Sequence, residues 1–172
     1  MITQDHLKER LDYDKDSGWL IWKPKIGDDG ETKRWNKLFS GKIAGCVDKR
    51  DYVVINLDGK AYKAHRLIYL LVTGIDPEQI DHINGICNDN RWCNLRQASG
   101  SENQQNRKRS VNNSSGFTGV YFHKQRNKYR AIIKLNSKRV QIGEYDSPEE
   151  ARAAYLSAKS QLHSFQPFLR EG

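Results

Sequence analysis

Cysteine is scarce in this sequence, and its number is odd. The 172 residues include three cysteines, Cys46, Cys87 and Cys93. An odd count argues against a disulfide framework and fits a reducing cytoplasm. A structural zinc site needs four ligands, usually in closely spaced pairs, and we find no second Cys/His pair beside these three. We therefore interpret them as ordinary thiols in a cytoplasmic protein.

Long apolar runs are also missing. The longest, Leu67 to Val72, is far too short to cross a bilayer, and no signal peptide is visible. Hydrophobic residues make up 37% of the chain, and the mean hydropathy is −0.84. These values permit only modest cores with much polar surface, and they make a membrane an unexpected partner.

The first two thirds of the chain have no excess of either charge. Up to Asn106 the sequence has 16 Lys and Arg against 16 Asp and Glu, whereas from Arg107 onward it has 13 against 5. The whole excess of +8 is therefore at the back. A neutral front and a basic back suggest a catalytic part delivered by a nucleic-acid-binding part.

Asp81 and His82 are adjacent, and their side chains suit different chemical tasks. A carboxylate binds hard cations through oxygen, and an imidazole accepts a proton from water near neutral pH. Neighbours on a strand point to opposite faces, so the strand must end or twist here if both are to serve one site. Asn84-Gly85 supplies a turn at this point.

The chain beyond this turn is predicted to form a loop, a strand and a helix. Ile86 to Cys93 is a polar loop, and Leu95 to Ala98 is a short strand. Ser99 is a good helix N-cap, and Glu102 three positions later completes a capping box. Asn103 is therefore expected in the first helical turns, near the two strands.

Strand, loop, strand and helix in this order resemble the ββα-metal finger of HNH nucleases. The similarity is closest to phage and intron-borne homing endonucleases, and in a phage-encoded enzyme the cytoplasm would be the host's. The family pattern is Asp-His-x-x-Gly, then Asn-x-x-x-Asn-Leu, then Glu-Asn, which is found here at Asp81-His82…Gly85, Asn90…Asn94-Leu95 and Glu102-Asn103.

The resemblance implies a role for each of four residues. His82 is the general base that activates the attacking water, and Asn94 ties the loop so that His82 is correctly aimed. Asp81 and Asn103 hold one divalent metal, Mg²⁺ or Mn²⁺, against the scissile phosphate. A degenerate scaffold, acting as a non-catalytic DNA-binding regulator, is an alternative, because a lone Asp-His pair is usually an exposed turn. An RNA-binding protein is a second alternative.

Ahead of this finger we expect a β-rich extension. His65 and Arg66, at the start of the last helix before the finger, are either packing and capping residues or DNA contacts, and the first reading is commoner. The expected elements are a helix at 4–11, strands at 19–22, 42–47, 52–57 and 60–64, a polar loop at 27–32, an Asp58-Gly59 hairpin turn, and a helix at 65–73 that ends at Gly74.

The basic back end predicts a linker, three strands and a helix. Ser147-Pro148 followed by Glu150 is an unusually complete helix start. The linker is 110–116, the strands are 119–123, 129–135 and 139–145, and the helical stripe is Ala151, Ala154, Tyr155, Ala158 and Leu162.

Alternation along these strands assigns their two faces. The face expected to meet the helix has Val120, Phe122, Ala131, Ile133, Val140 and Ile142. The other face is cationic, with no acidic residue expected on it, and a slim sheet of this kind can enter the major groove. Arg130 and Arg139 would read guanine, Gln141 adenine, and Ile132 a thymine methyl. The full set of expected DNA-binding residues is Tyr121, His123, Arg126, Arg130, Ile132, Lys134, Arg139 and Gln141, with Arg107, Lys108 and Arg109 from the linker.

This region, roughly residues 116–164, is similar to the plant ethylene-response-factor type of DNA-binding domain. The similarity rests on Gly119-Val120-Tyr121, Lys128 to Ala131, Arg139 to Gly143 and Ser147 to Ala151. The chain departs from it where the plant family has arginine or tryptophan, at Tyr121, His123, Gln125 and Gln141, so the base-reading code is not transferable.

The sequence as a whole predicts an α+β protein with two parts. We expect an HNH domain with its β extension at 1–106 (the finger at about 78–106), a basic linker at 107–116, and a three-strand-plus-helix domain at 117–172. The expected partner is double-stranded DNA, with no membrane and no protein partner implied. One finger per chain favours nicking by a monomer, and a homodimer would be needed for a paired double-strand break.

Overall fold

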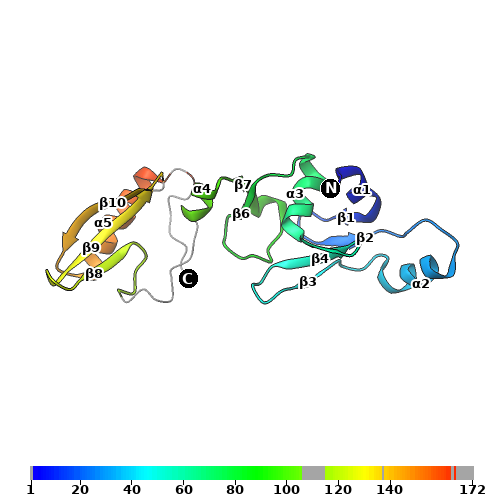
Figure 1. Ribbon diagram of the computed structural model, residues 1–172, viewed down its shortest axis with the longest axis horizontal. Helices are drawn as coiled ribbons and strands as arrows, with labels where there is room; N and C mark the ends of the chain where they lie inside the picture. Colours follow the sequence, from blue (N-terminus) through cyan, green and yellow to red (C-terminus); the bar gives the residue numbers. More distant parts are fainter. Residues whose placement is uncertain (1, 106–114, 137, 164, 166–172) are drawn as a thin grey trace. The chain divides into compact units, whose positions relative to one another are not determined.

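The computed structural model describes residues 2–105, 115–136, 138–163 and 165, and it divides the chain into two compact units, 1–97 and 98–172 (Figure 1). Each unit has its own hydrophobic core. Among the described residues, no helix combines the length and the apolar character that a membrane span requires. The arrangement is a mixed α+β fold with several small sheets, as the sequence predicts.

The first unit contains short helices and small sheets. Its strands pair as β1–β2, β3–β4–β5 and β6–β7. The elements are α1 (Gln4–Arg10), β1 (Leu11–Tyr13), β2 (Leu20–Trp22), α2 (Gly30–Phe39), β3 (Cys46–Val47), β4 (Val53–Leu57), β5 (Lys60–Lys63), α3 (Ala64–Thr73), β6 (Gln79–His82), the 3₁₀ turn η1 (Trp92–Asn94) and β7 (Leu95–Ala98).

Two turns in this unit confirm the local sequence signals. Asp58 and Gly59 have φ values of 51° and 75°, the left-handed pair that a tight hairpin requires between β4 and β5. Gly74 ends α3 with φ 75°, and its N–H donates to the Leu70 carbonyl at 2.9 Å. Glycine adopts this conformation without steric cost, which is why α3 stops there.

The prediction of a loop at 27–32 is wrong for residues 30–32, because α2 begins at Gly30. The Asp29 carboxylate caps this helix by accepting from the Thr32 N–H at 2.8 Å. No residue of α2 is buried, so its sequence lacks the apolar stripe by which helices are usually predicted. The Trp35 ring still contacts Trp22, with the ring centroids 5.6 Å apart.

In the first unit, the loop after β6 lies against the turn before β2. At Gly18, which has φ +78°, a Cβ atom would lie 2.5 Å from the backbone of Asn90 and Arg91. Only glycine permits this close approach. The core consists of Leu7, Leu11, Leu20, Ala44, Ile55, Leu57, Ala64, Leu67, Ile68, Leu70, Ile80 and Leu95.

The second unit confirms the prediction of three strands and a helix. Its elements are α4 (Gly100–Gln105), β8 (Val120–His123), β9 (Lys128–Leu135), β10 (Lys138–Tyr145) and α5 (Pro148–Leu162). The strands form an antiparallel sheet in the order β10–β9–β8. Ser147 caps α5, accepting from the Glu150 N–H at 3.2 Å. The core beneath α5 consists of Val120, Ala131, Ile133, Ala151 and Tyr155.

Candidate functional site

Asp81 and His82 occupy the last two positions of β6, and both are only 5% exposed. The strand ends at His82, as expected, and the Gly85 N–H donates to the His82 carbonyl at 2.9 Å in the turn that follows. Because successive side chains of a strand point to opposite faces, the two residues meet different partners.

The Asp81 carboxylate is held by Arg96 on β7. Arg96 donates to Oδ2 of Asp81 from Nε at 2.9 Å and from Nη2 at 2.7 Å. A buried carboxylate needs such a counter-charge, since an unpaired charge in the interior is strongly destabilising. A carboxylate offers about four lone-pair sites, so one that accepts from a guanidinium can also coordinate a cation.

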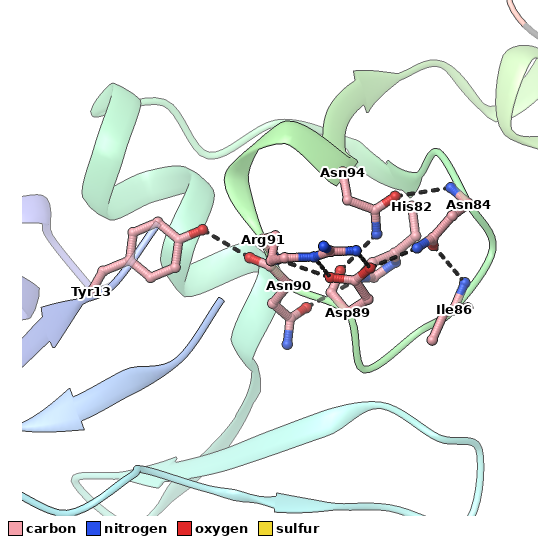
Figure 2. A network of polar contacts seen from close by, with 8 residues as sticks. All are labelled: Tyr13, His82, Asn84, Ile86, Asp89, Asn90, Arg91 and Asn94. Atoms are coloured by element: carbon pink, nitrogen blue, oxygen red, sulfur yellow. Dashed lines mark hydrogen bonds and ion pairs between the residues drawn. The ribbon is translucent and has the colours of Figure 1, made fainter. Parts of the chain in front are cut away.

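His82 is held on one side by Asn90. Its Nε2 lies 3.1 Å from Oδ1 of Asn90, a residue only 3% exposed (Figure 2). The Asn90 carbonyl accepts from the Tyr13 hydroxyl at 2.8 Å, so β1 supports this loop. Burial raises the pKa of Tyr13 above its usual value, which keeps the hydroxyl protonated as a donor.

Two further rings surround His82. The ring centroid of His65, on α3, is 5.0 Å from that of His82, and the rings are nearly perpendicular at 87°. Tyr52 contacts both, with centroids 5.4 Å from His65 and 6.2 Å from His82. The burial of His65 supports the packing interpretation of this residue over the DNA-contact interpretation.

The loop between β6 and β7 is braced by amide and carboxylate side chains. Asn94 donates from Nδ2 to the Asp89 carbonyl at 2.7 Å and accepts at Oδ1 from the Asn84 N–H at 2.9 Å. Asp89 in turn accepts from Arg91 at 2.8 and 2.6 Å, and this pairing lowers the pKa of Asp89 to about 2 (Figure 2). The sequence did not predict that Asp89 and Arg91 would brace this loop, because their contacts depend on how the loop folds.

Asn103 lies on α4, at the start of the second unit. The capping box predicted for this helix is present in both directions. The Ser99 N–H donates to Glu102 Oε2 at 2.8 Å, and the Glu102 N–H donates to Ser99 Oγ at 3.2 Å. Because Asn103 belongs to one unit and the Asp81-His82 pair to the other, a site shared by these three residues stays a prediction.

The exposed face of the second unit's sheet has a carboxylate that the sequence reading missed. Glu144 accepts from Arg130 Nε at 2.7 Å and from Arg126 Nη1 at 3.1 Å. Simple alternation places Glu144 on the helix side, but the register shifts between Gln141 and Gly143. This irregularity pairs Glu144 with Arg130 across the strands, so the expectation of a face without acidic residues is wrong.

The opposite face is only partly covered by α5. Val120, Ala131 and Ile133 are buried there, as predicted. Phe122 and Val140, also expected to meet the helix, are 41% and 42% exposed, which corrects that assignment. The helix covers the middle of the sheet, and Phe122 instead contacts Tyr129 at a centroid distance of 5.0 Å.

Most of the other expected DNA-binding residues lie on the strands, as predicted. Cross-strand pairs place Tyr121 opposite Arg130, Ile132 opposite Gln141 and Lys134 opposite Arg139. Residues that are directly opposite share a face of the sheet. His123 lies at the end of β8, and Arg126 lies in the turn before β9. Arg107, Lys108 and Arg109 lie outside the described residues.

Comparison with known families matches both parts of the chain. Residues 62–105 match the family model of the HNH endonuclease, and residues 115–164 match that of the AP2 domain. The protein joins an HNH endonuclease domain to an AP2 domain. No curated protein and no solved structure gives a significant match. The HNH match spans His65, Asp81, His82, Asn94 and Asn103.

The two domains support a nuclease function and DNA binding. HNH nucleases generally depend on a divalent metal, and the donor chemistry of this HNH domain fits one. Within the described residues, no group of three or more His, Cys, Asp and Glu side chains could hold an ion. Mg²⁺ commonly uses one or two protein oxygens and completes its shell with water and substrate phosphate. The Asp81 carboxylate is an oxygen donor of the kind that Mg²⁺ binds.

Proposed function

We propose that the protein is a metal-dependent, sequence-directed DNA endonuclease of the homing type that nicks duplex DNA. The observation that supports this most is the Asp81-His82 pair at the end of β6, inside the matched HNH domain. Both side chains are buried, and each has its own partner, Arg96 or Asn90. Such an arrangement is far from the exposed turn pair that an inert Asp-His would form.

His82 acts as the general base in this proposal. Its imidazole takes the proton of the attacking water, a role that typically contributes about 10²–10⁴-fold to the rate. Asn90 holds the ring through Nε2, and the Asn94 amide ties the loop that carries Asn90. These contacts fix the direction in which His82 presents its basic nitrogen.

Asp81 and Asn103 would hold the metal, Mg²⁺ or Mn²⁺. When bound, the ion would supply positive charge to the scissile phosphate and to the leaving 3′ oxygen. Arg96 keeps the Asp81 carboxylate oriented, because its guanidinium donates two hydrogen bonds to Oδ2.

The AP2 domain would select the DNA. The face that has Tyr121, Ile132, Lys134, Arg139 and Gln141 is proposed to dock on duplex DNA, as an antiparallel sheet can do in the major groove. The basic segment 107–109 would follow the phosphate backbone into the HNH domain. With a single HNH domain per chain, a monomer would cut one strand at a time.

A pool of circular plasmids with random inserts would test the proposal. We expect nicked circles to form first in the presence of Mg²⁺ or Mn²⁺, no cleavage in EDTA, and nicks that map to one sequence family. Linear product without a nicked precursor would contradict nicking. Tight binding with no cleavage under either metal would favour the non-catalytic regulator.

A further inference from the structure

His65 is a buried titratable residue that the proposed reaction does not use. It is the second residue of α3 and is only 7% exposed. The N-cap position of this helix, Lys63, makes no side-chain capping bond, and His65 points into the unit. The side chains that contact its ring indicate what His65 does.

The neighbours of His65 include His82 itself. Their nearly perpendicular rings, with centroids 5.0 Å apart, form an edge-to-face contact. Such contacts are directional, so one ring restricts the tilt of the other. Tyr52, just before β4, closes the cluster by contacting both rings. Two separate segments of the first unit thus contact the His82 imidazole.

Asn90 supplies the second restraint on His82, at its Nε2 atom. A neutral imidazole has one donor and one acceptor nitrogen. When Nε2 donates to the Asn90 Oδ1 at 3.1 Å, Nδ1 is the acceptor and therefore the basic nitrogen. Tyr13 and Gly18 hold Asn90 in place from β1 and from the following turn.

The charge state of His65 is compatible with this contact. Burial lowers the pKa of His65 to about 3, and the nearby His82 is the next largest cause. His65 is therefore neutral at neutral pH and places no positive charge against His82. A protonated neighbour would oppose proton uptake by the general base.

We propose that His65 is a positioning residue for His82: its buried ring fixes the tilt of the His82 imidazole and, with Asn90, keeps it in the tautomer whose basic nitrogen is Nδ1. The inference rests on the proposed function only where it assigns His82 as the general base. The orientation of His82 is a property of the free protein and is measurable without any cleavage.

The test uses the full-length chain with His65→Ala, His65→Phe and, as a control, His6→Ala at a partly exposed histidine. We expect His65→Ala to lower the single-turnover cleavage rate by about 10–100-fold with little change in DNA affinity, because misplacing a catalytic group by about 1 Å has costs of this order. The ¹⁵N NMR signals of His82, without DNA or metal, should change from one tautomer to an averaged mixture. His65→Phe keeps a ring in place and should retain both the tautomer and most of the rate.

Several outcomes would overturn the proposal. An unchanged rate and unchanged His82 signals in His65→Ala would make His65 a simple filler of the core. A His65→Phe variant as slow as His65→Ala, with the tautomer intact, would indicate a chemical role for the His65 imidazole. Should His65→Ala fail to fold, His65→Leu fills the volume without a ring and is expected to show the same averaged signals. A protein that never cuts DNA refutes the proposed function, whereas the NMR comparison still decides the positioning.

Discussion

Replacing His82 by alanine is expected to lower the DNA cleavage rate by about 10²–10⁴-fold, the usual contribution of a general base. The substitution removes the imidazole that Asn90 and His65 hold at the end of β6. DNA affinity should stay nearly unchanged, since His82 is buried and the proposed DNA-binding face lies in the AP2 domain. Single-turnover nicking of a plasmid with Mg²⁺ would measure the rate, and gel-shift titration would measure the affinity.

The matched control for this substitution is His6→Ala. His6 is a partly exposed histidine of the same unit, paired with Asp58 at 2.6 Å, and its loss should leave the rate unaltered. Thermal unfolding of both variants separates a chemical defect from a folding defect. Cleavage by His82→Ala at the wild-type rate would remove His82 from the reaction.

The second large effect is expected on the AP2 sheet. Lys134 and Arg139 lie directly opposite each other on β9 and β10, and both are exposed. Replacing both by alanine should weaken DNA binding by about 10–100-fold if Arg139 reads a base, a contact worth about 1–3 kcal/mol. If both instead contact phosphates, the slope of log K against log salt should shrink by about 2, since each phosphate contact contributes about 0.9.

Glu144→Gln, on the same face of the sheet, is a control that is expected to change DNA affinity in the opposite direction. Glu144 pairs with Arg126 and Arg130, so its neutralisation leaves both cations to interact with DNA. We expect tighter, more salt-dependent binding with weaker discrimination between sequences. Unchanged affinity in both variants would show that DNA binds elsewhere on the chain. Tighter binding of RNA than of matched duplex DNA would favour the RNA-binding alternative.

Local chemistry made much of the fold predictable from the sequence. The capping box at Ser99, the N-cap at Ser147 and the Asp58-Gly59 turn depend on residues at most three positions apart, and all three are present. Gly74 ends α3 for the same kind of reason. Signals of this type require no knowledge of the tertiary structure.

Features that depend on distant contacts were not predictable. The helix α2 has no buried residue, so no apolar periodicity marked it. The position of Glu144 follows from a register shift in β10 that alternation cannot reveal. In the candidate site, the motif indicated Asp81 and His82, but their partners come from other segments. The motif already included Asn90, but the contacts of Asn90 with His82 and of Arg96 with Asp81 became evident only in the folded structure.

The central claim is that one divalent ion is shared by Asp81 and Asn103 beside His82. Crystals of the full-length protein with duplex DNA and Mn²⁺ would test it through the anomalous signal of the metal. We predict one peak at roughly 2.0–2.2 Å from oxygens of both side chains and of the scissile phosphate, as for hard octahedral cations. A peak bound by other residues, or Asp81 and Asn103 too far apart to share an ion in the DNA complex, would contradict it.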